Sequence, residues 1–122
     1  MNNEKFDLTD KVALITGAAG LLGSRHAEAL LENNAKVILT DINQSSLDSL
    51  KKNLSRNFPL NKIIIYLMDI TNPESISSVS KKILANNLRV DILINNAAID
   101  PKVNKNLNLK NSSRLENFQL DD

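Results

Sequence analysis

The stretch LITGAAGLLGS, residues 14–24, decides how the chain folds. Its apolar run breaks into three glycines, Gly17, Gly20 and Gly23, and then passes into an alanine-rich helical pattern. A short apolar run bounded by turn residues is typical of a strand buried on both faces of a parallel sheet. The stretch therefore predicts a strand, a glycine turn and a helix, in that order.

The three glycines fit a binding site for a pyrophosphate. A phosphate needs hydrogen-bond donors, and the amino terminus of a helix offers unpaired backbone N–H groups at the positive end of a dipole. In this interpretation Gly17 permits the tight turn, Gly20 lets the backbone approach the phosphates, and Gly23 lets the helix pack closely against the sheet. A plain turn between strand and helix is the alternative.

The rest of the chain alternates between apolar runs and helical patterns. Strands are predicted over residues 12–15, 36–40, 62–68 and 90–96, and helices over 21–33, over 47–58 and from residue 71 onward. Strands that alternate with helices form a parallel sheet with helices on its faces, because each crossover is right-handed. We expect an α/β fold with an incomplete, Rossmann-type doubly wound parallel sheet of about four strands in the order 3-2-1-4.

Periodicity and capping signals add detail to the helices. At the start of the last helix, Thr71 and Glu74 fit a capping box. The "ENNA" segment supplies an asparagine for a left-handed stop to the first helix. In the first helix, helical spacing puts Leu22, His26 and Leu30 on one stripe, with Ala27 and Leu31 beside it. In the last helix, the residues predicted to face the core are Ile76, Val79, Ile83 and Leu84.

An acid follows the second predicted strand. Asp41 lies 18 residues after Gly23 (41 minus 23), close to the spacing at which a carboxylate meets the ribose of a dinucleotide. Such a carboxylate accepts hydrogen bonds from the adenosine hydroxyls and repels a 2′-phosphate, so NAD is favoured over NADP. The alternative is that Asp41 caps the next helix.

Polar residues also end the third and fourth predicted strands. Asp69 is placed to accept a hydrogen bond from the adenine amino group, and capping the next helix is its alternative role. Asn95 and Asn96 end the fourth strand, close to where a cofactor would cross the sheet, and their alternative role is turn formation.

Composition excludes several classes of function. The 122 residues suit one domain, residues 1–122, and beyond Pro101 the pattern becomes an irregular tail over residues 101–122. Fifteen basic and fourteen acidic side chains give a net charge of +1, and the lysines are scattered, so no nucleic-acid or membrane partner is expected. Without cysteine, and with a single histidine, His26, no metal site is expected. The polar N-terminus favours a cytoplasmic location.

At this point the chain resembles the short-chain dehydrogenase/reductase family over residues 11–98. "LITGAAGLLG" is similar to the family's glycine motif, "LTD" to its acid after the second strand, "MDIT" to its adenine-contacting acid, and "DILINNAA" to its Asn-Asn-Ala-Gly strand. The resemblance implies an NAD-binding oxidoreductase. The residues it assigns to the dinucleotide site are Gly17, Gly20, Leu22, Gly23, Asp41, Ile42, Asp69, Ile70, Asn96 and Ala97.

The chain departs from the main branch of that family in two places. Its glycines are separated by two residues and again by two, as in the extended branch of epimerases and dehydratases, whereas "ILINNAA" is similar to the main branch. Ala98 replaces the usual glycine, which shifts a contact near the cofactor. The tail "SSRLENFQL" is similar to members associated with surface-polysaccharide and flagellar-glycan pathways.

The family's proton donor is not found in these residues. The resemblance implies a tyrosine followed four positions later by a lysine, but the one tyrosine, Tyr66, is followed at that position by Ile70 and lies in a predicted core strand. We therefore assign no catalytic residue, and read His26 as a partly covered helix residue. The chain is interpreted as the NAD-binding N-terminal part of an oxidoreductase whose full-length parent takes a small-molecule substrate. A non-catalytic nucleotide-binding or interaction module is the alternative.

The fourth predicted strand, "VDILIN", would lie at an edge of the sheet. An apolar edge strand is a site of pairing with another chain. We therefore expect a homo-oligomer.

Overall fold

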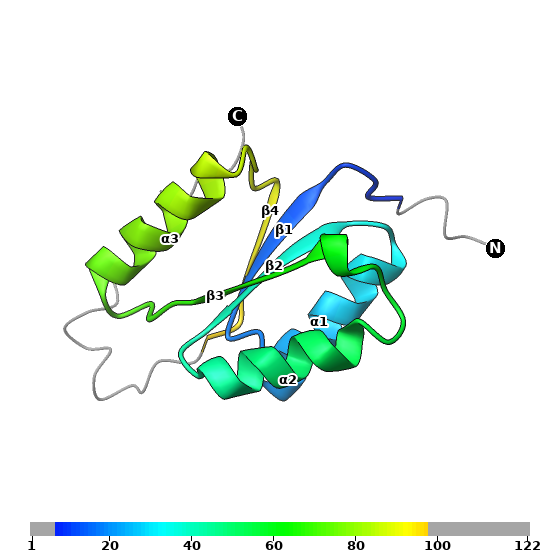
Figure 1. Cartoon of the computed structure of the whole chain (residues 1–122), viewed down its shortest axis with the longest axis horizontal. Coiled ribbons are helices and arrows are strands. Elements are labelled where there is room, and N and C mark those ends of the chain that lie inside the picture. The colour runs from blue at the N-terminus through cyan, green and yellow to red at the C-terminus, as the bar shows by residue number, and fades with distance from the viewer. Residues whose placement is uncertain (1–6, 98–122) are drawn as a thin grey trace.

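The computed structural model describes residues 7–97, and within them strands and helices alternate as the sequence predicts (Figure 1). The irregular tail, Ala98 and the "SSRLENFQL" segment lie outside the described residues. The elements are β1 (Val12–Thr16), α1 (Leu21–Glu32), β2 (Lys36–Asp41), α2 (Gln44–Leu54), the short 3-10 helix η2 (Leu60–Lys62), β3 (Ile63–Leu67), α3 (Pro73–Ala85) and β4 (Ile92–Asn95).

The four strands form one parallel sheet in the order β3-β2-β1-β4, which confirms the predicted topology. In the register of the two central strands, Leu14 lies opposite Ile38, and on the other side Leu14 lies opposite Leu93 of β4. Each connection therefore crosses a face of the sheet, as a Rossmann-type fold requires.

Successive residues of a strand point to opposite faces, so β1 contributes to two separate hydrophobic clusters. Leu14 packs with Ile38 and with the buried residues of α3, whereas Ile15 packs with Leu39 and with the buried residues of α1 and α2. Figure 1 shows α3 on one side of the sheet and α1 with α2 on the other. Full burial of each such Leu or Ile contributes about 1.5–3 kcal/mol to stability.

The buried face of α1 carries Ala27 and Leu31, which lie beside the predicted stripe of Leu22, His26 and Leu30. Gly23, Ala27 and Leu31 are buried, whereas Leu22 is 60% exposed and His26 and Leu30 are only partly covered. Small residues at the first two of these buried positions let the helix axis approach the sheet, and this approach fixes the rotation of the helix. The left-handed stop is confirmed, since Asn34 has a φ of 76° directly after the capping residue Asn33.

The other two helices also differ from prediction at their ends. α2 ends at Leu54 and is followed by a turn, so Phe58 packs on its cluster from outside the helix. In α3 the capping-box prediction is wrong: Asn72, not Thr71, is the N-cap, and its side chain accepts from the backbone N–H groups of Glu74 and Ser75. Leu84 is 48% exposed, while Ile76, Val79 and Ile83 are buried as predicted.

β4 lies at one edge of the sheet and, among residues 7–97, pairs with β1 alone. Asp91 ties its start to the sheet, because its Oδ2 accepts from Val12 N at 2.9 Å and its own N–H donates to Val12 O at 2.8 Å. In the described part of the chain no helix has the length and apolar character to cross a bilayer, and no cluster of three potential metal ligands occurs.

Because Asn72 is the N-cap of α3, substitutions at Asn72 and at its neighbour Thr71 are expected to change the free energy of unfolding by different amounts. Asn72→Ala removes the acceptor for two N–H groups at the start of α3 and is expected to lower the free energy of unfolding by about 1 kcal/mol. Thr71→Val changes only an exposed contact and is expected to cost less than about 0.5 kcal/mol. Urea denaturation followed by circular dichroism measures both, and an equal loss in the two variants would contradict the assignment.

Candidate functional site

The predicted site residues gather at the carboxyl ends of the four strands. The glycine turn follows β1, Asp41 ends β2, Asp69 follows β3, and Asn96 follows β4. The chain leaves β1 toward β2 on one side, while β4 returns to the other side of β1. In open parallel sheets ligands bind in the crevice at such a switch point.

The glycine turn is held directly against the end of β4. Gly17 has a φ of 61°, in the left-handed region that glycine adopts without strain. A Cβ added to Gly17 would lie 2.8 Å from both Cα and N of Ala97. The turn is closed by Gly20 N, which donates to Gly17 O at 3.2 Å, and Ala18 N donates to Thr40 O of β2 at 3.0 Å. Gly17 therefore serves the fold as well as the candidate site.

Gly23 sets the distance between α1 and this turn. A Cβ added there would overlap the carbonyl oxygen of Gly17 and lie 2.8 Å from Cα of Ala18. Since both neighbours are backbone atoms, neither can move aside as a flexible side chain would. The close packing predicted for Gly23 is present in the structure.

Gly20 is the N-cap of α1, and it differs from the other two glycines. A Cβ added to it would meet only Gly17 O, at 3.5 Å, which is an ordinary contact. The cap has no side-chain hydrogen bond, and the next two residues, Leu21 and Leu22, are 76% and 60% exposed. The first-turn N–H groups thus have no capping side chain, and the space beside Gly20 is open to a ligand. This arrangement fits a phosphate group.

Asp41 is fixed beside the glycine turn by two backbone donors. Its Oδ2 accepts from Ala19 N at 3.1 Å, and its Oδ1 accepts from Asn43 N at 3.2 Å. The N-cap of α2 is Asn43, whose Oδ1 accepts from Ser46 N, so the alternative role of Asp41 as that cap is wrong. Its neighbour Ile42 is 71% exposed and leaves an apolar surface next to the carboxylate.

Asp69 and Ile70 face different surroundings. Asp69 Oδ1 accepts from both N and Oγ1 of Thr71, at 2.9 and 2.7 Å, and the capping alternative is wrong because Asn72 caps α3. The side chain of Ile70 is only 7% exposed and belongs to the cluster under α3. The side chain of Ile70 is therefore not available to a ligand.

The end of β4 is organised by Thr16, a residue that the sequence analysis did not single out. Its hydroxyl donates to Asn95 Oδ1 at 2.7 Å and accepts from the backbone N–H groups of Asn96 and Ala97, at 3.1 and 3.3 Å. One hydroxyl thus holds three consecutive residues of β4 and its exit. A threonine directly before the first glycine of the turn was the available signal.

The two residues that were assigned no catalytic role make contacts within the fold. The Tyr66 hydroxyl accepts from Asn86 Nδ2 at 3.1 Å at the carboxyl end of α3, and Lys82 Nζ lies 5.9 Å from the centre of its ring. His26 is partly covered, and its Nδ1 lies 2.9 Å from Asn96 Nδ2.

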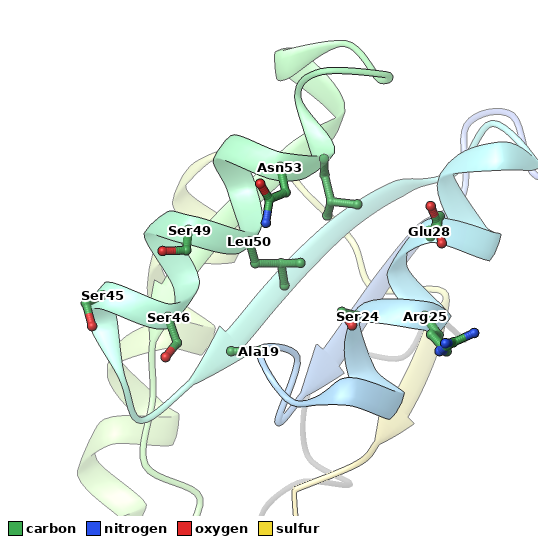
Figure 2. A pocket seen from close by; sticks show the side chains of 10 residues that line it. Ala19, Ser24, Arg25, Glu28, Ser45, Ser46, Ser49, Leu50 and Asn53 are labelled. Atoms are coloured by element: carbon green, nitrogen blue, oxygen red, sulfur yellow. The ribbon is translucent and has the colours of Figure 1, made fainter.

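A polar groove of about 460 Å³ separates α1 from α2 (Figure 2). Ala19 of the glycine turn lies at one end, and Leu50 of α2 points toward α1, whereas Arg25 extends to the side away from α2. Ala19 connects this groove to the turn, but none of the ten residues assigned to the site lines it. The groove therefore adjoins the candidate site and is distinct from it.

The glycine geometry predicts losses of stability of different size for two similar substitutions. Gly23→Ala forces backbone atoms apart and is expected to lower the free energy of unfolding by about 1–3 kcal/mol. Gly20→Ala meets only an ordinary contact and is expected to cost less than about 1 kcal/mol. Thermal and urea denaturation of the two variants test this, and a Gly20 variant as unstable as the Gly23 variant would contradict it.

Comparison with known proteins agrees with this geometry. The sequence model of the family described as short chain dehydrogenase matches residues 11–119. The NAD(+)-dependent 15-hydroxyprostaglandin dehydrogenase of Mus musculus is 36% identical over 94 residues, which are 77% of this chain and 35% of that protein. The NAD-dependent glycerol dehydrogenase of Listeria innocua is 37% identical over 98 residues, 80% of this chain and 36% of that protein. The chain spans about a third of the length of these curated relatives.

Solved structures of oxidoreductases are also similar to this chain. A D-mannonate oxidoreductase structure described as putative, from Haemophilus influenza with bound NAD, superposes with a TM-score of 0.70 at 31% identity, covering 82% of this chain and 35% of that one. A short chain dehydrogenase structure from Escherichia coli, also described as putative, has a TM-score of 0.78 at 22% identity over 90% of this chain and 55% of that one, which shows the shared fold. By its fold, by the arrangement of residues at the strand ends and by these matches, the chain belongs to the short chain dehydrogenase family.

Proposed function

We propose that the chain binds NAD along the carboxyl ends of its strands, as the nucleotide-binding part of an oxidoreductase. The observation that carries the proposal is the pairing of two features at one place. The amino terminus of α1 has no capping side chain beside Gly20, and the Asp41 carboxylate is held next to it by Ala19 N. One feature suits a pyrophosphate and the other a ribose.

Each part of the cofactor is assigned to its own set of residues in the proposed site. The turn with Gly17, Gly20 and Gly23 and the adjacent Leu22 receive the pyrophosphate, where the helix dipole favours negative charge. Asp41 accepts from the ribose hydroxyls. The exposed side chain of Ile42, the Asp69 carboxylate and the Ile70 backbone flank the adenine. Asn96 and Ala97, at the end of β4, lie beside the part of the cofactor that crosses β1.

A preference for NAD over NADP follows from the charge of Asp41. Its carboxylate repels a 2′-phosphate and accepts from a free 2′-hydroxyl. Two of the relatives above carry NAD in their names, and the structure from Haemophilus influenza holds NAD, which supports the choice of cofactor.

The preference is tested by two substitutions that remove one negative charge each. Asp41→Asn is expected to narrow the difference in binding free energy between NAD and NADP by about 1–3 kcal/mol, because the acceptor loses the charge that strengthens its hydrogen bonds to the ribose and repels a 2′-phosphate. Asp48→Asn removes a charge from an exposed position of α2, outside the proposed site, and is expected to leave the difference unchanged. Isothermal titration calorimetry with both cofactors measures the effect, and wild-type affinity for NADP equal to that for NAD would overturn the preference.

The reaction that we propose for the whole protein is hydride transfer between NAD(H) and a hydroxyl or carbonyl substrate. Bound NAD supplies the hydride acceptor, and the described residues of this chain bind and orient it. The link to surface-polysaccharide or flagellar-glycan synthesis and the cytoplasmic location stay predictions. A binding module without chemistry, or part of an extended-branch epimerase or dehydratase, is the alternative.

We also propose that the chain forms a homo-oligomer through β4. Its edge pairs with no other strand among residues 7–97, and its residues 92–94 are only partly buried. Ile92→Lys places a charge on this edge and is expected to shift the chain toward monomer. Leu60→Lys, at an exposed leucine of η2, is the control and is expected to have no effect. Sedimentation velocity measures both, and a wild-type monomer at high concentration would contradict the proposal.

A further inference from the structure

His26 joins α1 to the end of β4 across 70 residues of sequence. Its Nδ1 lies 2.9 Å from Asn96 Nδ2, and both side chains are partly buried. An amide nitrogen can only donate, so Nδ1 accepts, and the proton of the neutral ring is on Nε2. With the amide nitrogen facing the ring, the contact selects the tautomer that carries its proton on Nε2.

The position of His26 on α1 explains how it reaches β4. It lies three residues, just under one helical turn, after Gly23, whose missing side chain brings α1 against Gly17 and Ala18. A larger separation of helix and sheet would carry the imidazole away from Asn96. The glycine that sets the packing distance thus also brings the histidine within hydrogen-bond range.

Asn96 is the residue through which this contact acts on the candidate site. Its backbone N–H is shared between Thr16 O and Thr16 Oγ1, at 3.2 and 3.1 Å, and the next residue, Ala97, packs against Gly17. The side-chain bond to His26 is a further restraint on the same residue, from the opposite element. With it, the exit of β4 is held from both the strand side and the helix side.

We propose that His26 is a positioning residue of the dinucleotide site: through its Nδ1 it holds Asn96, and with it the backbone of Ala97, against the glycine turn. The inference rests on the proposed function in that the element so held borders the NAD site. His26 itself touches no cofactor in this arrangement. Its effect is to keep the crevice between β1 and β4 preformed, which lowers the ordering cost of binding.

The contact is tested first in the full 122-residue chain without cofactor. Nitrogen chemical shifts of the imidazole are expected to show an unprotonated Nδ1 and a protonated Nε2 at neutral pH. A protonated Nδ1 would overturn the inference, and this measurement needs no variant. Because free histidine also favours the Nε2–H tautomer, the discriminating signal is a scalar coupling across the hydrogen bond from Asn96 Nδ2 to His26 Nδ1, which a histidine that only fills space would not give.

Two substitutions then distinguish the effect of the Nδ1 acceptor from the effect of the aromatic ring. His26→Phe keeps an aromatic ring and removes Nδ1, leaving the Asn96 amide without its acceptor. His26→Asn removes the ring but places Oδ1 where Nδ1 was, and asparagine has a helix propensity similar to that of histidine. Glu32→Gln, exposed at the far end of the same helix, is the control.

The expected results are a loss in the first variant and rescue in the second. In His26→Phe the dissociation constant for NAD is expected to rise about tenfold and hydrogen exchange at the amides of Asn96 and Ala97 to speed up by a similar factor. His26→Asn is expected to stay within about twofold of wild type. Unchanged exchange in His26→Phe, or equal losses in both variants, would overturn the inference. If wild-type chain bound no NAD, the proposed function would fail, while the exchange data would still decide whether His26 holds the end of β4.

Discussion

The backbone contact of Gly23 with Gly17, and of Gly17 with Ala97, is the constraint on which the rest of the structure depends. It stacks the first turn of α1 on the glycine turn, and the glycine turn on the exit of β4, with no side chain between them. Protein interiors tolerate little change in volume, so one methyl group in this stack displaces backbone. The same approach leaves the first N–H groups of α1 beside the glycine turn at the carboxyl end of β1, so that the packing and the candidate site share one cause.

The parallel arrangement of the strands explains why the polar residues meet. All four strands run in one direction, so their carboxyl ends lie along the same edge of the sheet. Asp41, Asp69 and Asn96 come to this edge although tens of residues separate them in the sequence. Hydrogen bonds then tie the ends of both strands that flank β1 to it. Asp41 at the end of β2 accepts from Ala19 N of the glycine turn, and Asn96 after β4 donates its backbone N–H to Thr16 Oγ1. The site is therefore assembled by topology and adjusted by a few polar contacts.

The chain belongs to the short chain dehydrogenase family, but it covers only part of the length of its relatives. The match extends over residues 11–119, and the chain spans about a third of the length of its curated relatives, so the activity of the whole protein stays a proposal. Among the described residues, the Tyr66 hydroxyl accepts from Asn86 Nδ2 at the end of α3, which is a contact within the fold.

By itself, the sequence determined the order of elements, the parallel sheet with its strand order, and the glycine turn with its neighbouring acids. These follow from local rules: apolar runs form buried strands, glycine permits close approach, and right-handed crossovers leave few topologies. Tertiary structure alone decided the rotation of α1, which buries Ala27 and Leu31 and leaves Leu22 exposed, and the choice of Asn72 over Thr71 as a cap. It also decided the hydrogen bonds of Thr16 and the contact between His26 and Asn96. The physical reason is that each of these depends on the distance between two elements far apart in the chain, and periodicity along one element carries no information about that distance.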